Sequence, residues 1–460
     1  MARPTLRPVS TSTPAFVPGA RARPIFDTEL RERIANRSAR IGVVGLGAVG
    51  LPLAEAFVEA GFAVLGHETD AQRVLAIERG ENPLGHLRPG MVQRMRASRR
   101  FEAGTDSARL SELDVALVCV PTPLDERREP DLSHVREAAR ALAQNLRPGA
   151  LVVLESTTWP GTTRQILGGI FRAHGRLPGE DVLLAYSPER EDPGREDART
   201  ATIQKLVGGT CPRSQRLAVE LYRAAVREVH EVSSAEVAEA AKLFENVYRA
   251  VNIALVNELK LVLERAGVDV WETLAAAGTK PFGFLGFSPG PGTGGQCIPV
   301  DPRYYAWIAR ELGGEARLVE QADAINRAMP AHVVERTRRA LAARGRALLG
   351  ARVLVLGVAY KQDVDIVSES PALEVLRLFA AQGAQVSYSD PHVPELASSG
   401  GALRSRRIDA ALLAGIDAAV LVTAHSDFDY RLIAERAPLV VDTRHAFAER
   451  GLAPPNVVGA

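Results

Sequence analysis

The chain has 460 residues, of which 46% are hydrophobic and 24% charged, the composition of a soluble globular protein with several domains. Its 56 basic and 55 acidic residues leave a formal net charge of +1. Nucleic acid is therefore not expected as a partner, because such binding needs a strongly basic surface. Three scattered cysteines argue against a disulfide framework, and no apolar run reaches membrane-spanning length. These features predict a cytoplasmic protein that does not enter a membrane.

The N-terminal segment differs in composition from the rest of the chain. Residues 1–23 are rich in proline, arginine, serine and threonine and contain no acidic residue. No apolar core segment of a secretory signal is present, so a disordered segment is favoured over a targeting peptide. A disordered tail is predicted over residues 1–38.

A doubly wound α/β domain is predicted from residue 39 to residue 212. Continuous apolar runs, typical of parallel strands covered on both faces, recur through this range and alternate with helical patterns. Strands are expected at 40–45, 62–66, 115–120 and 151–155, and a helix at 51–59.

Between residues 213 and 330 a central helical domain is expected. Apolar residues recur every three or four positions from 233 to 266 without proline or glycine. This spacing predicts one long amphipathic helix that ends at Gly267. Such a helix between two α/β domains commonly supplies a dimer surface, so a homodimer or a larger homo-oligomer is expected.

The stretch from 280 to 302 is rich in glycine and proline but also holds several large apolar side chains: Phe282, Phe284, Phe287, Ile298 and Val300. A flexible linker would be more polar. A packed functional loop is therefore favoured.

A second α/β unit is predicted from 331 to 460, with strands at 352–357, 384–389, 418–423 and 438–442. The complete fold is α/β, with an N-terminal Rossmann domain, a central domain built on a long helix, and a C-terminal Rossmann-like domain.

Three glycines mark a dinucleotide-binding turn after the first strand. Gly45 permits the tight turn, Gly47 lets the backbone approach a pyrophosphate, and Gly50 allows the helix to pack closely on the strand. Glu68 ends the second strand, where an acid accepts hydrogen bonds from ribose hydroxyls and repels a 2′-phosphate. The sequence therefore predicts NAD rather than NADP. The turn at Gly357 of the second unit lacks the other two glycines, which favours a mononucleotide or a sugar nucleotide there.

Several further motifs follow one another along the chain. They are residues 118–123 (VCVPTP), 155–163 (ESTTWPGTT), 186–190 (YSPER), 242–246 (KLFEN), 294–302 (GGQCIPVDP), 357–361 (GVAYK), 369–373 (ESPAL) and 389–391 (SDP). In these motifs, and in their order, the chain resembles the UDP-glucose/GDP-mannose dehydrogenase family over residues 40–455.

The resemblance implies a four-electron oxidation of a UDP-sugar at carbon 6, with two NAD and no metal. Cys297 is similar to the family nucleophile, which captures an aldehyde as a thiohemiacetal and then carries a thioester. Asp301 resembles the acid that activates water, and Glu189 the glutamate of acid–base chemistry. Lys242 and Asn246, four residues apart on one helix face, correspond to groups that stabilise developing negative charge.

The same resemblance implies further binding residues. Thr122 corresponds to a threonine near the nicotinamide, and Arg73 and Thr157 to other contacts with the cofactor. Lys361 matches a lysine that contacts the substrate. The remaining substrate contacts implied in this way are Glu189, Arg190, Lys242, Asn246 and Gly295.

Residues 187–194 (SPEREDPG) are similar to the branch of the family that acts on UDP-N-acetylhexosamines; the UDP-glucose branch usually has a second glutamate where Pro193 stands. UDP-N-acetylglucosamine is the first choice, with UDP-N-acetylmannosamine and UDP-glucose as alternatives. Two positions depart from the pattern: Gln296 replaces a histidine before the nucleophile, and Ser368 replaces an arginine. These departures keep open a catalytically silent homologue that only binds sugar nucleotides. A β-hydroxyacid dehydrogenase, which shares the first domain and a helical centre, is the other alternative.

Overall fold

The structure is a computed structural model that describes residues 24–85, 87–190, 200–397 and 401–460. The chain forms two compact units. The first comprises the described residues between 24 and 245 together with 303–315, and the second comprises 246–302 and the described residues between 316 and 460. Each unit is described by itself below.

The first unit is built on an eight-stranded sheet of order β3-β2-β1-β4-β5-β6-β7-β8. Its strands are β1 Arg40–Val44, β2 Ala63–His67, β3 Phe101–Gly104, β4 Val115–Val118, β5 Ala150–Leu154, β6 Val182–Tyr186, β7 Lys205–Gly209 and β8 Val229–Glu231. Neighbouring strands are parallel except β6 and β7. The continuous apolar runs of β4 and β5 are buried along their whole length, which is why they lack the alternation of a half-exposed strand. The predicted strands of this domain are confirmed.

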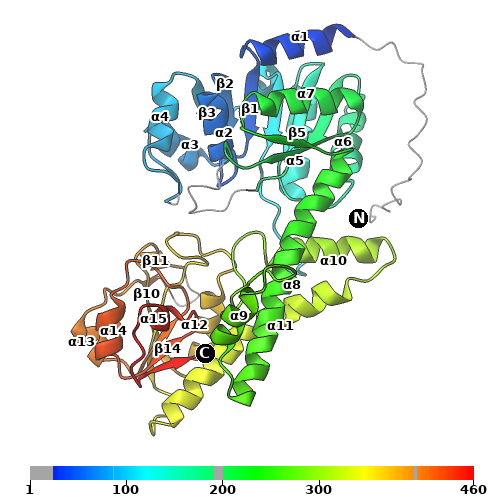
Figure 1. Ribbon diagram of the computed structural model, residues 1–460. Helices are drawn as coiled ribbons and strands as arrows, with labels where there is room; N and C mark the ends of the chain where they lie inside the picture. Colours follow the sequence, from blue (N-terminus) through cyan, green and yellow to red (C-terminus); the bar gives the residue numbers. More distant parts are fainter. Residues whose placement is uncertain (1–23, 86, 191–199, 398–400) are drawn as a thin grey trace. The chain divides into compact units, whose positions relative to one another are not determined.

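Helices pack around this sheet (Figure 1). They are α1 Pro24–Ala35, α2 Gly50–Glu59, α3 Ala71–Glu78, α4 Met91–Ala97, α5 Ser133–Asn145, α6 Gly168–Ala173 and α7 Pro212–Arg223, with a 3₁₀ turn η1 at Ser107–Glu112 and a π-helical turn η2 at Thr162–Leu167. Asp70 caps α3 by accepting the N–H groups of Gln72 and Arg73, as expected of an aspartate that precedes a helix.

The predicted disordered tail over residues 1–38 is wrong for part of its range. Residues 1–23 lie outside the described residues, but Pro24–Ala35 form α1. Leu30 and Ile34, one helical turn apart, are buried in the core of the first unit. Their burial stabilises a helix that the polar composition of the segment did not indicate.

The first sheet continues past residue 212, the predicted end of its domain. Helix α7 contributes Leu217 and Tyr222 to the core, and β8 extends the sheet beyond β7. The chain therefore completes this sheet before the long helix begins.

Helix α8 spans Ala235–Ala266 and confirms the long helix predicted from apolar spacing. It starts in the first unit and continues into the second. Gly267, with a φ of 69°, follows it in the left-handed conformation that ends helices. Helices α9 Val270–Gly278, α10 Asp301–Glu311 and α11 Arg317–Ala342 follow.

The glycine- and proline-rich loop is only partly packed. Phe282, Phe284 and Leu285 are exposed, whereas residues 289–291 and Val300 are buried. The expectation of a packed loop is therefore correct for its second half and wrong for its first.

The second unit contains a parallel sheet of order β10-β9-β13-β14-β15. Its strands are β9 Arg352–Leu356, β10 Gln385–Ser389, β13 Ala418–Leu421, β14 Val440–Asp442 and β15 Val457–Gly459; β11 Glu395–Leu396 and β12 Leu403–Arg404 form a separate antiparallel pair. The helices of this region are α12 Pro371–Ala381, α13 Ala410–Ala414, α14 Tyr430–Arg436 and α15 Ala446–Glu449.

Both faces of this sheet are covered. Val353 and Val355 of β9 pack into one core with α11 and α12, while Leu354 and Leu356 pack into another with α13 and α14. Alternate residues of one strand thus serve two apolar layers, as in a doubly wound fold. Within the described ranges, no helix is long and apolar enough to cross a membrane.

Candidate active site

The glycine turn after β1 has the geometry that the sequence predicted. Gly45 has a φ of 95°, which a side chain would strain. A Cβ on Gly50 would lie 1.9 Å from the carbonyl oxygen of Gly45, so only glycine lets α2 approach the turn this closely. A Cβ on Gly47 would meet nothing within 4 Å. The backbone at Gly47 is thus open, at the N-terminus of α2, to a pyrophosphate.

Glu68 lies directly after β2 and is 7% exposed. Its carboxylate accepts the N–H of Leu46 at 3.0 Å and pairs with Arg73 at 3.1 Å. The carboxylate of Glu68 therefore holds the glycine turn through the N–H of Leu46, and Arg73 holds that carboxylate by an ion pair. A carboxylate held here fits the ribose hydroxyls of NAD.

Two threonines predicted to contact the cofactor follow neighbouring strands of the sheet, Thr122 after β4 and Thr157 after β5. The carboxyl ends of parallel strands meet at one edge, beside the glycine turn. The loop of Thr122 is held by Tyr304 of α10, whose hydroxyl donates to the carbonyls of Thr122 and Pro123 at 3.0 and 3.2 Å.

The loop that carries Glu189 is held by a buried ion pair between Lys205 and Glu155. Lys205 donates to Glu155 at 2.5 Å and to the carbonyl of Pro188 at 2.9 Å, and Tyr222 donates to the same glutamate. Burial would lower the pKa of Lys205, but the adjacent carboxylate of Glu155 raises it, so the ammonium stays charged. This pair therefore anchors the backbone immediately before Glu189.

Arg190 and Lys242 both lie in the first unit, and they differ in their polar contacts. Arg190 pairs with Glu245 at 2.8 Å and donates to the carbonyl of Gln204 at 2.7 Å. Lys242 of α8 is 7% exposed, and its ammonium makes no hydrogen bond or ion pair with any residue that the structure describes. A buried cation without a counter-charge is costly unless a ligand supplies an anion.

The predicted nucleophile lies in the second unit, on a tight turn before α10. The carbonyl of Cys297 accepts the N–H groups of Val300 at 3.1 Å and Asp301 at 2.8 Å. Cys297 is exposed, whereas Asp301 is 2% exposed and its carboxylate accepts the side-chain amide of Asn246 from α8. The turn thus brings together three of the predicted catalytic residues.

Gly294 and Gly295, just before this turn, pack against the second α/β domain. A Cβ on Gly295 would lie 2.7 Å from the ring of Tyr360, and its N–H donates to the carbonyl of Ser368 at 3.0 Å. The backbone of these two glycines therefore lies close to protein groups of the same unit. Tyr360 precedes Lys361, so the nucleophile turn and the loop of the predicted substrate lysine are neighbours.

Three residues of the second unit had no assigned role in the sequence. Asp390 accepts the N–H groups of Val358 and Ala359 at 2.7 and 3.0 Å, and His425 contacts the same carboxylate oxygen at 3.0 Å. Arg444 is half-buried next to Gly290, and desolvation lowers its pKa to about 10. Asp390 follows the second strand of its sheet as Glu68 does in the first, a parallel visible in the sequence. His425 and Arg444 have no comparable signal.

With this geometry the chain can be placed among known proteins. The model of the NAD binding domain of the UDP-glucose/GDP-mannose dehydrogenase family matches residues 39–226. The family's central domain matches residues 236–328, and its UDP binding domain matches residues 354–449. The chain belongs to the UDP-glucose/GDP-mannose dehydrogenase family.

Three relatives illustrate the range of this family. The UDP-N-acetyl-D-glucosamine 6-dehydrogenase of Pseudomonas aeruginosa is 34% identical over 359 residues, covering 78% of this chain and 84% of the relative. The NDP-N-acetyl-D-galactosaminuronic acid dehydrogenase of Ralstonia nicotianae is 32% identical over 423 residues, covering 90% and 97%. The solved UDP-D-ManNAc dehydrogenase of Pyrococcus horikoshii superposes with a TM-score of 0.82 at 30% identity, covering 91% and 98%.

Membership in the UDP-glucose/GDP-mannose dehydrogenase family decides several predictions. NAD is the cofactor and a UDP-sugar is the class of substrate, and both the family resemblance and the fold class are confirmed. The alternative of a β-hydroxyacid dehydrogenase is wrong, because a UDP binding domain occupies the C-terminal α/β unit. The roles of individual site residues stay predictions.

Proposed function

We propose that this protein is a UDP-N-acetylglucosamine 6-dehydrogenase, which oxidises the primary alcohol of the sugar to a carboxylate in two two-electron steps. The observation that supports it most is the turn from Cys297 to Asp301, which joins an exposed thiol to a buried carboxylate held by Asn246. NAD, when bound at the glycine turn of the first unit, supplies the hydride acceptor for both steps.

In this proposal Cys297 forms the covalent intermediates. After the first oxidation its thiolate adds to the aldehyde carbon, and the carbonyl oxygen becomes the alkoxide of a thiohemiacetal. The second oxidation converts this carbon to a thioester, and water then cleaves the carbon–sulfur bond to release the carboxylate and regenerate the thiol.

Asp301 activates the water of the last step. Its carboxylate is buried and accepts the side-chain amide of Asn246, which orients the carboxylate that takes a proton from water. Lys242 supplies positive charge for the alkoxide and for the oxyanion of thioester cleavage. Its burial without a counter-charge among the residues that the structure describes supports that role. Glu189 is the further acid–base group, on a loop anchored through Pro188 by Lys205.

The choice of sugar rests on similarity. The three relatives above are named for N-acetylhexosamine derivatives, and Pro193 stands where the UDP-glucose branch usually has a glutamate. UDP-N-acetylmannosamine and UDP-glucose remain the alternatives. The backbone carbonyl of the exposed Ser368 accepts the N–H of Gly295. The serine that stands in place of an arginine therefore keeps this backbone hydrogen bond next to the turn of Cys297.

The deciding experiment is an absorbance assay of NADH formation with a panel of UDP- and GDP-sugars. UDP-N-acetylglucosamine should give the highest kcat/KM and two NADH per sugar. It should exceed UDP-glucose by roughly ten- to hundredfold, because a pocket built for an acetamido group leaves about one polar partner unmet when a hydroxyl replaces it. A preference for UDP-glucose would overturn the choice of sugar. No NADH with any sugar, despite binding, would show the silent homologue.

We also propose that the protein works in the cytoplasm as a homodimer or a larger homo-oligomer. Helix α8 supports the homo-oligomer, because it exposes three apolar side chains, Phe244, Leu255 and Val262, at 60–68% of their area. Apolar residues exposed along one helix indicate an interaction surface. Light scattering of Leu255→Glu against the wild type tests it, and a monomeric wild type would contradict it.

A further inference from the structure

The loop of residues 357–363 occupies the point in the second sheet where the strand order reverses. It follows β9, and β9 lies between β10 and β13 in the sheet. Ligands of doubly wound folds bind outside the carboxyl ends of the strands at such a point. The conformation of this loop therefore sets the shape of the UDP binding domain where a nucleotide is expected.

Asp390 anchors the first half of the loop. It is 3% exposed, and one carboxylate oxygen accepts the N–H groups of Val358 and Ala359 while the other accepts those of His392 and Val393. Burial would raise the pKa of Asp390, but hydrogen bonds from His425 and these N–H groups lower it. The anchor is thus a carboxylate at neutral pH.

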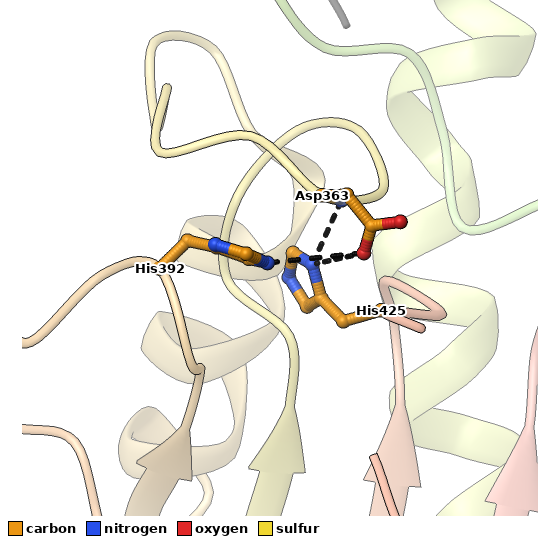
Figure 2. A group of neighbouring side chains, drawn as sticks. All are labelled: Asp363, His392 and His425. Carbon is orange, nitrogen blue, oxygen red and sulfur yellow. Dashed lines mark hydrogen bonds and ion pairs between the residues drawn. The ribbon is translucent and has the colours of Figure 1, made fainter. Parts of the chain in front are cut away.

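His425 anchors the second half. Its ring is fully buried, and Nδ1 lies 3.0 Å from the backbone nitrogen of Asp363 (Figure 2). Nε2 lies 3.0 Å from a carboxylate oxygen of Asp390. A backbone N–H can only donate, so Nδ1 must be the acceptor. The proton is then on Nε2, which donates to Asp390. The backbone of the loop thus selects one neutral tautomer of His425.

A metal ion is the other reading of this cluster. Ring nitrogens of His392 and His425 and a carboxylate oxygen of Asp363 lie within 4.8 Å of one another. A cation held there would need the lone pair of His425 Nδ1, which already accepts the N–H of Asp363, and the Nε2 lone-pair position faces Asp390. The cluster is therefore a hydrogen-bonded anchor rather than a set of ligands.

The anchored loop carries groups that matter for the site. Tyr360 packs against Gly294 and Gly295, directly before Cys297, and Lys361 follows it. Asp363 closes the loop with a φ of 57°, a left-handed conformation that costs an L-residue energy. Its carboxylate accepts the N–H of Ser426 at 2.8 Å, which helps to hold that conformation.

We propose that His425, supported by Asp390, is a positioning residue for the nucleotide: as a neutral imidazole it fixes the loop of residues 357–363 in the form that binds UDP. The inference rests on the proposed function in taking a UDP-sugar as the ligand. His425 touches neither the reacting carbon nor the cofactor in this role, so its loss weakens binding more than turnover.

Other polar groups surround the ring of His425. A carboxylate oxygen of Asp363 lies 3.7 Å from Nδ1. The ring of His392 is tilted against that of His425 with centroids 4.9 Å apart and lies 3.6 Å from Asp427, and the hydroxyl of Tyr430 donates to the carbonyl of His425. The position of the His425 ring is therefore fixed from several sides.

Calorimetry with UDP on the full-length protein tests the proposal, because UDP binding does not require the correct sugar. His425→Gln places an amide N–H near the position of Nε2 and removes the acceptor for the backbone N–H of Asp363. His425→Asn places an amide oxygen near the position of Nδ1, so it keeps an acceptor for that N–H. His425→Gln should weaken UDP binding by roughly tenfold to hundredfold, as expected when a buried donor loses its acceptor. His425→Asn should lose clearly less UDP affinity than His425→Gln. KM for the UDP-sugar should rise more than kcat falls.

His392→Asn is the matched control, because this neighbouring imidazole makes no side-chain hydrogen bond within the described part of the chain. It should bind UDP as the wild type does. NAD affinity, which belongs to the first unit, should be unchanged in all variants. Normal UDP binding by His425→Gln, or equal losses in His392→Asn, would overturn the proposal. So would a zinc-dependent rise in UDP affinity that His392→Asn abolishes.

His425→Ala provides a separate arm if His425→Gln does not fold, because it removes the acceptor for the N–H of Asp363 without adding a donor. It should lose more UDP affinity than His425→Asn. Equal UDP affinities of these two variants would overturn the proposal. A protein that meets these expectations but does not oxidise UDP-N-acetylglucosamine would retain the positioning role and lose the proposed substrate.

Discussion

The proposed nucleophile, Cys297, lies on a turn that also carries Asp301, which accepts the side-chain amide of Asn246. The backbone turn sets the distance between the thiol and the carboxylate, and one amide from α8 sets the direction of the carboxylate. The thiol is exposed and the carboxylate is buried, so substrate can reach one while the other stays shielded from bulk water. This arrangement makes the covalent step testable by single substitutions.

Cys297→Ala should abolish formation of the uronate while NAD binding and the fold survive. Cys297→Ser should accumulate an ester adduct that intact mass spectrometry detects, because an ester is cleaved more slowly than a thioester. Cys211→Ser is the control, since a hydroxyl can replace the thiol that accepts the N–H of Ser214 at the start of α7, and its activity should be normal. Wild-type rates in the alanine variant would remove the nucleophile from the mechanism.

Glu68 should decide cofactor preference in two ways. The wild type should use NAD far better than NADP, and Glu68→Ala should narrow the gap because repulsion of the 2′-phosphate is lost. Since Glu68 also accepts the N–H of Leu46, the same change should raise KM for NAD by roughly tenfold or more. Glu68→Gln separates the two effects, because it keeps an acceptor without the charge. Equal use of NAD and NADP by the wild type would contradict this role.

At the scale of single residues, the sequence predicted those residues whose role depends on the local backbone conformation. The glycine spacing specified a turn, and Gly45, Gly47 and Gly50 have the geometry required of them. Leu46, whose N–H Glu68 accepts, and the partners of His425 follow other strands, so no local pattern could indicate these contacts. The half-buried Arg444 was missed for the same reason.

Helix α8 illustrates what an element contributes beyond its apolar periodicity. Glu239, on its second turn, is fully buried and accepts the N–H groups of Gly161 and Thr163 together with the hydroxyl of Thr163. The N-terminus of η2 thus receives its acceptor from another helix rather than from its own sequence. The spacing of apolar residues predicted α8 but gave no sign of this contact.

The pH dependence of stability should report on Glu239. Burial raises its pKa from 4.5 to about 8 in the folded protein, so its stabilising contribution is present below pH 4.5 and is lost as the pH rises to 8. Glu239→Gln should be less stable by about 1–3 kcal/mol at pH 5, because one backbone N–H loses its acceptor, and the difference should shrink toward pH 8. Urea unfolding at both pH values measures it.

Glu236→Gln is the control for this prediction, since Glu236 lies one turn earlier on α8 and pairs with Arg164 at 2.6 Å. Burial would raise the pKa of Glu236, but that arginine lowers it. The control should therefore leave the slope between pH 5 and pH 8 unchanged. An unaltered slope in Glu239→Gln would contradict the prediction.

On the scale of the whole molecule, the first unit is not made from one continuous stretch of chain. Residues 303–315 return to it after the chain has entered the second unit. Trp307 packs on Trp159 with ring centroids 4.5 Å apart, and Tyr304 holds the loop of Thr122. Composition and periodicity predicted two α/β domains with a helical centre, but a returning segment of this kind depends on tertiary contacts and left no local pattern.

A fragment of residues 24–245 should therefore be less stable than the same unit in the full chain. Without α10, Trp159 loses an aromatic contact worth about 0.5–1.5 kcal/mol in addition to its buried area, and the loop of Thr122 loses its hydroxyl donor. Near-ultraviolet circular dichroism during thermal unfolding measures the loss. A peptide of residues 301–315 added in excess should restore part of it. A fragment as stable as the full chain would show that the returning segment is dispensable.

The returning segment also sets an order of events during synthesis. When residue 245 leaves the ribosome, every strand of the first sheet has been made, yet the helix that covers Trp159 has not. At 5–20 residues per second, the missing segment arrives roughly 3–11 s later. During that interval the nascent cofactor domain leaves exposed the aromatic surface at Trp159 that Trp307 covers in the complete fold.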